Sequence, residues 1–593
     1  MPFLFYANRI SVCLLPNKTH PVGKLGAVEA PKERIIEPLF KVIGGSVEPI
    51  NQIAAGLGIK EEHLIPFGRY KAKISMDALN DVAQNRRGKL VVVTGMTPTP
   101  AGEGKTTTAV GLTQGMGRLG HKAVVNLREP SLGPIFGIKG GGTGGGKARV
   151  VPEDEINIHF TGDAHSVSSA HNLLSALVDN AVYRNEASGM DPTGIQWSRV
   201  TDASDRSLRQ VIAGVGGEGN SPLRETRFDF VAASEIMAVM ALSTGLEDLR
   251  SRISQIVVGT SRTGEPVSVK MLGFTGALMT LLHNTIIPNM VQTMEGQPAF
   301  IHTGPFGNIA HGCSSVVADQ LGLAYADYVI TEAGFGSDLG FEKFMHIKAR
   351  QSGLLPSAVV LVASVRALRW HGGSTRRELS QPNLDAVVSG GVNLAHHVGI
   401  VRAFGLPVVV AINNFDGDGA DELKAAKETA LAAGATEAVE CSGFADGGEG
   451  GMALAEAVVR ATAGASTGSP INYAYDLDAP VRDKVLALAQ RTYGAEDVTW
   501  TPEARRKLRY FESQGWGSLP ICMAKTHLSI SHDPTRRGSP SGYTFPISDI
   551  RASVGAGFLY TLAGRIETLP GLPSRPRALD MDVDASGEVI GLS

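Results

Sequence analysis

The chain has 593 residues, 43% of them hydrophobic and 19% charged, which is typical of a folded globular protein and argues against a disordered or fibrous one. A chain of this length exceeds a single hydrophobic core, so roughly two to four domains are expected. The net charge of −3 gives no general attraction to nucleic acid or to an anionic membrane surface. No run of about 18 apolar residues occurs, so the sequence predicts no membrane-spanning helix.

Residues 1–47 contain scattered proline and glycine with weak hydrophobic periodicity. The first six residues are apolar, but no basic residue precedes them and no clear cleavage site follows, which argues against a secretory signal. We interpret 1–47 either as a poorly ordered N-terminal extension or as the product of a start codon placed too far upstream.

The four cysteines, Cys13, Cys313, Cys441 and Cys522, lie far apart and form no CxxC pair. This spacing argues against a zinc ribbon and against a disulfide framework. It fits a reducing compartment, and we expect a cytoplasmic protein.

Short apolar segments rich in β-branched residues recur along the chain, each followed by a loop and a helical segment. Near-continuous apolar strands that alternate with helices are typical of a parallel sheet buried on both faces. The expected fold is α/β, a doubly wound and mainly parallel sheet with a P-loop NTPase-like core, whose ligands bind beyond the carboxyl ends of the strands. The predicted strands are 90–94, 123–127, 328–331, 359–363 and 407–412.

The pattern changes twice, which predicts two smaller α+β domains. Helices are expected at 206–212 and 233–242, inside the first of them. From about residue 469 the chain is richer in proline and glycine and carries short strand candidates. The predicted division is 48–195 for the first part of the core, 196–270 for an inserted domain, 271–468 for the continued core and 469–593 for a C-terminal domain.

Glycine is over-represented: it makes up 71 of the 593 residues, about 12% against a usual share of about 7%. Much of it lies in two clusters, 139–147 and 447–451. Because strand-like and helix-like segments flank both clusters, we interpret them as places of close backbone approach to a ligand rather than as flexible linkers.

A phosphate-binding loop is predicted where the apolar segment 90–94 runs into Gly-Met-Thr-Pro-Thr-Pro-Ala-Gly-Glu-Gly-Lys105-Thr106. Backbone N–H groups and a helix N-terminus would face the phosphates, Lys105 would bridge the β and γ oxygens, and Thr106 would ligate Mg²⁺. Thr99 replaces the usual first glycine, so a turn that binds nothing is the alternative. The predicted ATP-binding residues are Thr99, Pro100, Ala101, Gly102, Glu103, Gly104, Lys105 and Thr106.

Arg128 and Glu129 directly follow the next predicted strand, 123–127. A guanidinium at the carboxyl end of a strand could bind a carboxylate or a transferring phosphoryl group through two parallel hydrogen bonds. A surface Arg–Glu pair is the alternative, and the residues by themselves leave both open.

These segments and several later ones resemble the formyltetrahydrofolate synthetase family. The matches run in order from about Glu48 to the C-terminus, which is far more specific than a phosphate loop by itself. The family implies ATP-dependent ligation of formate to tetrahydrofolate through formyl phosphate, giving 10-formyltetrahydrofolate, ADP and phosphate. The longest matching segments are 97–106, 127–134, 156–163, 304–313, 331–340 and 365–373.

Carried over by motif, the resemblance implies that Lys105 and Arg128 stabilise the transferring phosphoryl group and the formyl phosphate. Glu129 and Asp163 occupy family active-site positions, where they could organise the metal or assist proton loss from the folate amine; the sequence leaves this open. The family further implies MgATP, formate and tetrahydrofolate as ligands, K⁺ or NH₄⁺ as an activator, and a homotetramer. Neither nucleic acid nor membrane is an expected partner.

The resemblance also places Phe335, Phe415 and Phe444 at folate positions, where a flat pterin would stack on an aromatic ring. Phe444 stands where the family has tryptophan, and a smaller ring predicts weaker folate affinity. Asp416 replaces a family proline, and Lys147 replaces a family aromatic residue. Lys147 could assist anion binding or face solvent, and we favour solvent.

Two other functions fit part of the sequence: a P-loop NTPase of another class, and a non-catalytic descendant that still binds folate or nucleotide. The order of the folate-region motifs argues against the first, and the presence of Lys105, Thr106, Arg128, Glu129 and Asp163 argues against the second. No segment before the phosphate loop could hold the dehydrogenase/cyclohydrolase domain of trifunctional relatives, so ligation without a second activity is expected. With no HExxH or paired Cys/His spacing, no metal site is expected at His159, His165, His171, His302, His311 or His371.

Overall fold

The computed structural model describes residues 47–82, 88–99, 102–139, 141–184, 189–217, 219–220, 222–464, 470–564 and 566–592. All of them belong to one compact unit, Gly45–Ser593. The extension predicted at 1–47, apart from Val47, and the loop residues Pro100 and Ala101 lie outside the described residues. Within the described ranges, no helix is both long and apolar enough to cross a membrane.

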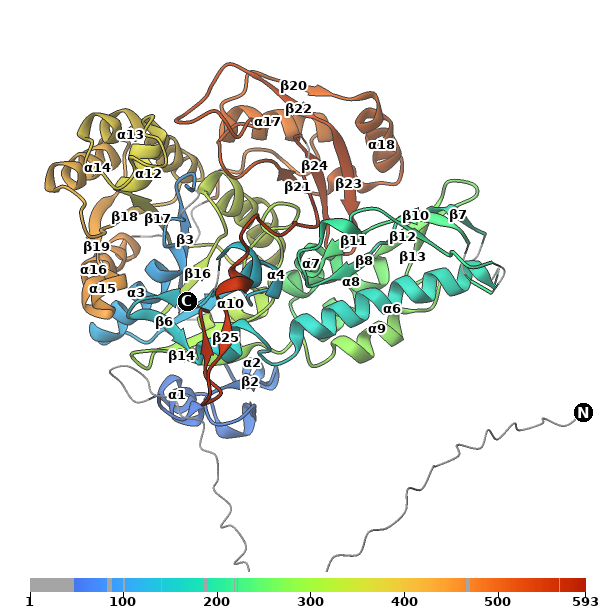
Figure 1. Cartoon of the computed structure of the whole chain (residues 1–593), viewed down its shortest axis with the longest axis horizontal. Coiled ribbons are helices and arrows are strands. Elements are labelled where there is room, and N and C mark those ends of the chain that lie inside the picture. The colour runs from blue at the N-terminus through green and yellow to red at the C-terminus, as the bar shows by residue number, and fades with distance from the viewer. Residues whose placement is uncertain are drawn as a thin grey trace, which may run out of the picture. The chain divides into compact units, whose positions relative to one another are not determined.

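A large mixed, mostly parallel sheet forms the centre of the molecule (Figure 1). Pairing is parallel along β15, β4, β16, β3, β17, β18 and β19, and antiparallel at the other end, where β6 also pairs with β14. The five predicted strands are observed as β4, β16, β3, β17 and β18. The order is β1 (Leu64–Pro66), β2 (Ala72–Ile74), β14 (Asn289–Thr293), β15 (Pro298–Ile301), β4 (Ala123–Leu127), β16 (Tyr328–Glu332), β3 (Lys89–Gly95), β17 (Ala358–Ser364), β18 (Val408–Asn413) and β19 (Glu437–Cys441), with β5 (Gly144–Gly145) and β6 (Ala148–Val151) joined at β14.

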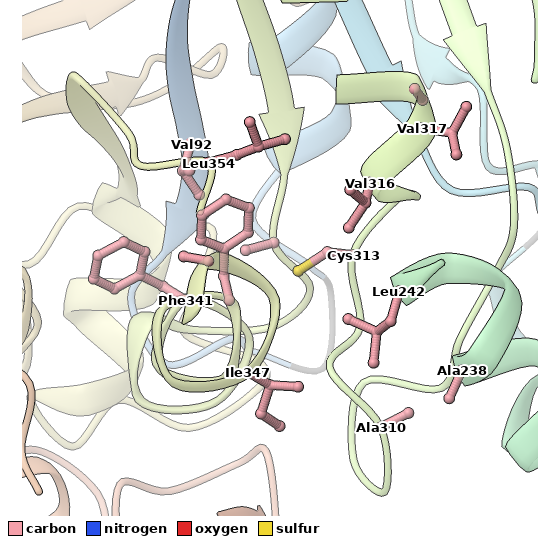
Figure 2. Close-up of a cluster of buried hydrophobic side chains, with 14 of the residues drawn as sticks. Val92, Ala238, Leu242, Ala310, Cys313, Val316, Val317, Phe341, Ile347 and Leu354 are labelled. Carbon is pink, nitrogen blue, oxygen red and sulfur yellow. The ribbon is translucent and has the colours of Figure 1, made fainter. Parts of the chain in front are cut away.

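The strands are apolar throughout because both faces of the sheet are covered. In β17 every residue is buried, and successive side chains enter two different hydrophobic clusters. Leu361 belongs to one cluster together with Leu394 of α13 (Leu384–Ala403). Val360 belongs to the other, with side chains of α3 (Lys105–Arg118) and α16 (Gly448–Ala463). Figure 2 shows part of the first cluster, including Val92, Cys313 and Phe341.

Helices α3 and α16 pack backbone to backbone, and their glycines allow it. A Cβ on Gly451 would lie 2.1 Å from the carbonyl oxygen of Gly111, and one on Gly115 would lie 2.7 Å from the backbone of Gly451. Gly451 of the 447–451 cluster therefore serves helix packing, and the approach of this cluster to a ligand stays a prediction.

The remaining helices cover the sheet and build the smaller parts of the fold. They are α1 (Ile50–Leu57), α2 (Asp77–Val82), α4 (Leu132–Pro134), α5 (Glu153–Asn157), α6 (Asp163–Tyr183), α7 (Glu235–Leu242), α8 (Leu246–Gln255), α9 (Thr275–Leu282), α10 (Val316–Tyr325), α11 (Arg350–Ser352), α12 (Val365–His371), α14 (Ala420–Ala432), α15 (Gly443–Asp446), α17 (Val481–Tyr493) and α18 (Pro502–Ser513), with π-helical turns at η5 (Ser337–Phe341) and η6 (Phe344–Ala349).

Small sheets flank the central one (Figure 1). The C-terminal part has a hydrophobic cluster of its own, to which strands of its small sheets contribute. The domain boundaries at 195/196, 270/271 and 468/469 stay predictions. The small sheets pair β7 (Met190–Ile195), β12 (Val257–Ser261) and β13 (Pro266–Ser268); β8 (Arg199–Thr201) and β11 (Phe228–Phe230); β9 (Val211–Ala213) and β10 (Arg224–Thr226); β20 (Asp497–Trp500) and β22 (Thr544–Ile547); β21 (Ile521–Ala524), β24 (Phe558–Leu562) and β23 (Asp549–Ser553); and β25 (Asp582–Val583) and β26 (Val589–Ile590).

One of the two helices predicted in the inserted region is wrong. Only Arg206–Leu208 forms a short 3₁₀ turn, after which β9 begins and pairs with β10. Val211 and Ile212 are β-branched, and cross-strand pairing within the β9–β10 hairpin outweighs their local helical pattern. The second helix is confirmed as α7, and Ser234 caps it by accepting a hydrogen bond from the backbone N–H of Ile236.

Candidate active site

The predicted site residues gather at one edge of the central sheet, where the parallel strands end. Glu332 at the end of β16 pairs with Val93 of β3, and Asn413 at the end of β18 pairs with Ser364 of β17. The strands therefore end nearly level, and the loops that follow share this edge. Those loops carry Arg128 and Glu129 after β4, Phe335 after β16, Thr99 and residues 102–106 after β3, Phe415 after β18 and Phe444 after β19.

The phosphate loop is shaped by Gly104 and by a side chain from another strand. Gly104 has a φ of 72°, and a Cβ there would lie 2.8 Å from Nδ2 of Asn413. That amide donates to the carbonyl oxygen of Glu103 at 2.7 Å, while its Oδ1 accepts from the Thr108 hydroxyl at 2.9 Å. Helix α3 begins at Lys105 without a side-chain cap, which suits an anion at its N-terminus.

The Glu103 side chain points into the protein rather than out of the loop. Its Oε1 accepts from the backbone N–H of Thr99 at 2.7 Å, and its Oε2 accepts from the Ser364 hydroxyl. The side chain is buried, and burial raises the pKa of the carboxyl group. Within the loop predicted to bind ATP, Glu103 thus holds the backbone in shape.

Glu332 is a site residue that sequence reasoning missed. Its Oε2 accepts a hydrogen bond from Oγ1 of Thr106 at 2.7 Å, and its Oε1 lies 3.5 Å from the guanidinium of Arg128. The available signal was an acidic residue ending a predicted strand, at the edge where ligands bind. Burial lowers the pKa of the Lys105 ammonium group, and the charge of Glu332 opposes that shift.

Arg128 lies across the loop after β16. A Cβ on Gly334 would be 3.0 Å from a terminal nitrogen of the guanidinium, so only glycine leaves room for it there. In the described part of the chain the ion-pair partner of Arg128 is Glu332, so the alternative of a surface pair with Glu129 is wrong. The half-buried guanidinium therefore stands beside the phosphate loop.

Glu129 and Asp163 have different surroundings. Lys73 Nζ donates to both oxygens of Asp163, at 2.9 and 2.8 Å, and Asn289 donates to one of them at 2.8 Å. Oε2 of Glu129 is buried without a hydrogen-bond partner among the described residues. Burial, followed by the negative charge of Asp163, raises the pKa of Glu129 to about 8. Asp163 is an anchored carboxylate, whereas Glu129 is able to exchange a proton near neutral pH.

The three predicted folate residues lie along the same edge of the sheet. Among the ring contacts of the described residues, none joins two of these three side chains. Phe335 has a φ of 60°, a strained conformation for a side chain of this size, and its ring stacks on His527 at 4.8 Å between centroids. The guanidinium of Arg366 lies 5.0 Å from the Phe415 ring centroid. Phe444 is 55% exposed. At about 4.8 Å per strand, the ends of β16 and β18 are about 14 Å apart, so a ligand contacting both loops must be extended.

Two of the altered positions are open to solvent. Lys147 and Asp416 are both exposed. The backbone N–H of Lys147 donates to the carbonyl oxygen of Phe444 at 2.9 Å, and a Cβ on Gly145 would lie 3.0 Å from the Phe444 ring. The first glycine cluster therefore supports the Phe444 loop.

Several of the histidines have structural partners. His171 bonds the Ser234 hydroxyl at 2.8 Å, and His302 bonds the Ser315 hydroxyl at 2.6 Å. In the described ranges, one group could be spaced for a metal ion, Glu62, His63 and Asp81, and it lies outside the site. Lys60 already pairs with Asp81 there at 2.7 Å.

Comparison with known proteins adds an independent line of evidence. The family profile described as formate–tetrahydrofolate ligase matches residues 44–593. A protein of that name from Roseiflexus sp. (strain RS-1) is 52% identical over 555 residues, which cover 92% of this chain and 98% of the relative. Those from Desulforamulus reducens and Methylorubrum extorquens (strain PA1) are 48% and 49% identical, again over 92% of this chain and over 97% and 98% of the relatives.

Proposed function

Because the chain belongs to the formate–tetrahydrofolate ligase family, we propose how the residues at the carboxyl edge of its sheet carry out that reaction. The enzyme is an ATP-dependent ligase that formylates tetrahydrofolate. Its core is a doubly wound sheet that carries a P-loop-like nucleotide site, and the folate loops lie on the same edge of that sheet.

The observation that carries the assignment is the Glu332 carboxylate, which lies between the Thr106 hydroxyl and the Arg128 guanidinium. It fixes the relative positions of the two groups that would face a γ-phosphate, and its charge opposes the burial that lowers the pKa of Lys105. A fixed set of positive groups stabilises the charge that develops on a transferring phosphoryl group.

In the first step a formate oxygen attacks the γ-phosphorus of ATP, and the bond to the ADP oxygen breaks. Lys105 and Arg128 stabilise the equatorial oxygens as ADP leaves and formyl phosphate forms. In the second step N10 of tetrahydrofolate attacks the formyl carbon, the carbon–oxygen bond to phosphate breaks, and the amine loses a proton. The products are 10-formyltetrahydrofolate, ADP and phosphate.

The oxygen groups at the loop fit Mg²⁺, which favours hydroxyl, carboxylate and phosphate oxygens. The Thr106 hydroxyl donates a hydrogen bond to Glu332, so the lone pairs of the hydroxyl oxygen stay available to a cation. Bound with ATP, the ion would neutralise phosphate charge. Thr106 would hold it, and Glu332 would orient Thr106.

Glu129 is the residue we assign to the proton released by N10. Its pKa of about 8 is close to working pH, where proton transfer is efficient, and its Oε2 is not engaged by any described group. Asp163 forms an ion pair with Lys73, and its negative charge contributes to the raised pKa of Glu129. We therefore assign Asp163 a positioning role.

Phe335, Phe415 and Phe444 are assigned to the folate, with the pterin on one ring and the remainder extended along the edge. The support is their common position after β16, β18 and β19 and the exposure of Phe444. The solvent-exposed Phe444 ring gives the pterin an apolar surface to cover.

The resemblance also supports a homotetramer and K⁺ or NH₄⁺ activation, and the spacing of the cysteines supports a reducing cytoplasmic compartment. On the hairpin β9–β10, Ile212, Val215 and Leu223 are 59%, 67% and 70% exposed, which suits burial in an assembly. Cys313, Cys441 and Cys522 are free and buried. Light scattering, turnover in K⁺ against tetramethylammonium, and fractionation of cells would test these three points.

The function is tested by measuring ADP release with MgATP while formate and tetrahydrofolate are omitted in turn. The folate product is followed after acid conversion to the absorbing methenyl form. We expect turnover only with all three substrates, and its loss in Lys105→Ala but not in Lys424→Ala, whose side chain is 72% exposed on α14. ADP release that ignores formate and folate would contradict the assignment.

A further inference from the structure

His397 of α13 lies between two loops of the site and bonds to both. Its Nε2 is 2.8 Å from Oγ1 of Thr97, in the loop that leaves β3 toward the nucleotide. Its Nδ1 is 2.7 Å from Oγ of Ser337, two residues after Phe335. The imidazole is buried, and no role in the reaction above has been given to it.

One proton arrangement satisfies all the polar atoms around this ring. Asn393 Nδ2 donates to Thr97 Oγ1 at 3.1 Å, and the Ser337 hydroxyl is placed to donate to the carbonyl oxygen of His397 at 3.3 Å. The Thr97 hydroxyl can then donate a hydrogen bond to Nε2, while Nδ1–H donates to Ser337 Oγ. The opposite tautomer would leave the Thr97 proton without an acceptor among these groups, so the hydrogen bonds select the Nδ1–H form.

Burial keeps this arrangement in place across the working pH range. It lowers the pKa of His397 to about 3, although the nearby charge of Asp338 opposes the shift. Other charged or titratable groups facing the ring are His371, His396 and Lys525, and each lowers the pKa further. A neutral ring keeps one nitrogen as an acceptor for Thr97, which a protonated ring could not do.

The two loops are also in direct contact beside the ring. A Cβ on Gly336 would lie 3.1 Å from Cε1 of His397 and 3.3 Å from the carbonyl oxygen of Met96. The loop after Phe335 therefore packs against the residue that precedes Thr97, with no space for a side chain. Because packed groups do not deform continuously, a shift on one side must be taken up on the other.

We infer that His397 is a positioning residue that couples the nucleotide loop to the Phe335 loop, so that nucleotide binding changes the affinity for the folate ring. The inference rests on the proposed contact of Phe335 with folate. Binding at residues 97–106 fixes Thr97, Thr97 fixes the ring, and the ring fixes Ser337 and the strained backbone of Phe335 next to it. By linkage, folate must affect nucleotide affinity by the same factor.

Two substitutions separate the two contacts. The amide oxygen of glutamine reaches the position of Nε2 and can accept from Thr97, while the amide nitrogen of asparagine reaches the position of Nδ1 and can donate to Ser337. His397→Gln therefore keeps the Thr97 side, and His397→Asn keeps the Ser337 side. The measured quantity is the ratio of the tetrahydrofolate Kd without and with saturating MgADP. We expect a ratio of about five-fold or more in the unsubstituted protein. In both variants we expect the ratio to approach one, with each binary Kd within about two-fold of the original.

His396→Gln is the matched control. His396 is the adjacent residue of α13 and also makes two hydrogen bonds, at 2.8 Å to Ser539 and 2.9 Å to the carbonyl oxygen of Thr492, neither in the site loops. The control should keep the original ratio. An unchanged ratio in both His397 variants, or a ratio of one in the unsubstituted protein, would overturn the inference.

Two further variants keep the inference testable if the His397 variants do not fold. Thr97→Val should change the KM for tetrahydrofolate, and Ser337→Ala should change the KM for ATP, each with little change in kcat. Effects confined to the nearer ligand would overturn the coupling. Phe335→Ala tests the underlying assignment separately, because an unchanged folate Kd there would refute folate contact without touching the ratio measured at His397.

Discussion

The raised pKa of Glu129 makes a quantitative prediction about pH. If ionised Glu129 accepts the N10 proton, activity follows the ionised fraction of a group with a pKa of about 8. That fraction is about 0.09 at pH 7, 0.5 at pH 8 and 0.9 at pH 9, so kcat/KM should rise about ten-fold from pH 7 to pH 9. The groups facing Glu129 are Asp163 and Asp202, which raise its pKa, and Lys73, which lowers it.

Glu129→Gln should remove this rise and lower kcat by about 100-fold, because the amide cannot accept the proton. The assay is the initial rate of methenyl formation at saturating MgATP and formate between pH 6 and 9.5. Glu225→Gln, an exposed carboxylate on β10, is the control and should keep the original profile. A Glu129→Gln profile that still rises through pH 8 would refute the reasoning.

The same pKa predicts a change in stability that does not depend on activity. Since the pKa is raised in the folded state, the stability it provides is complete below the ordinary value of 4.5 and is lost as pH rises through about 8. The shift corresponds to at most about 5 kcal/mol. Glu129→Gln should therefore be more stable than the original protein at pH 9, and the difference in unfolding free energy between the two should be smaller at pH 5. Equal pH dependence of the two melting temperatures would contradict the burial argument.

Three further predictions concern the loops. Glu332→Gln should raise the free Mg²⁺ concentration needed for half-maximal MgADP binding by about ten-fold, because the Thr106 proton loses its anionic acceptor; ADP binding without Mg²⁺ should not weaken. Gly104→Ala should cost about 1 to 2 kcal/mol of unfolding free energy and weaken ATP binding, since a φ of 72° and a Cβ 2.8 Å from Asn413 both oppose it; denaturant unfolding and ATP titration check it. Phe444→Trp should lower the KM for tetrahydrofolate by about two- to ten-fold through a larger stacking surface; an unchanged or higher KM would argue against a pterin there.

The strands and the start of α3 could be predicted because their signals are local. The five apolar segments became β3, β4, β16, β17 and β18, since a strand buried on both faces must be apolar at every position. The order of strand, loop, Lys105 and Thr106 predicted the start of α3 for the same reason. A P-loop-like site at the carboxyl edge stays a prediction from the α/β pattern.

The partners of these residues could be found only in the tertiary structure, because they come from distant parts of the chain. Thr106 meets Glu332 across 226 residues, and Thr97 meets His397 across 300. No periodicity links such positions; the order of strands in the sheet does. The wrong helix at 206–212 has a different cause, since its β-branched residues Val211 and Ile212 pair within the β9–β10 hairpin instead. The sequence by itself determined which chemical groups stand at the edge of the sheet. Only the packing decided that Asp163 forms an ion pair with Lys73, while Glu129 keeps an oxygen without a partner among the described residues and a raised pKa.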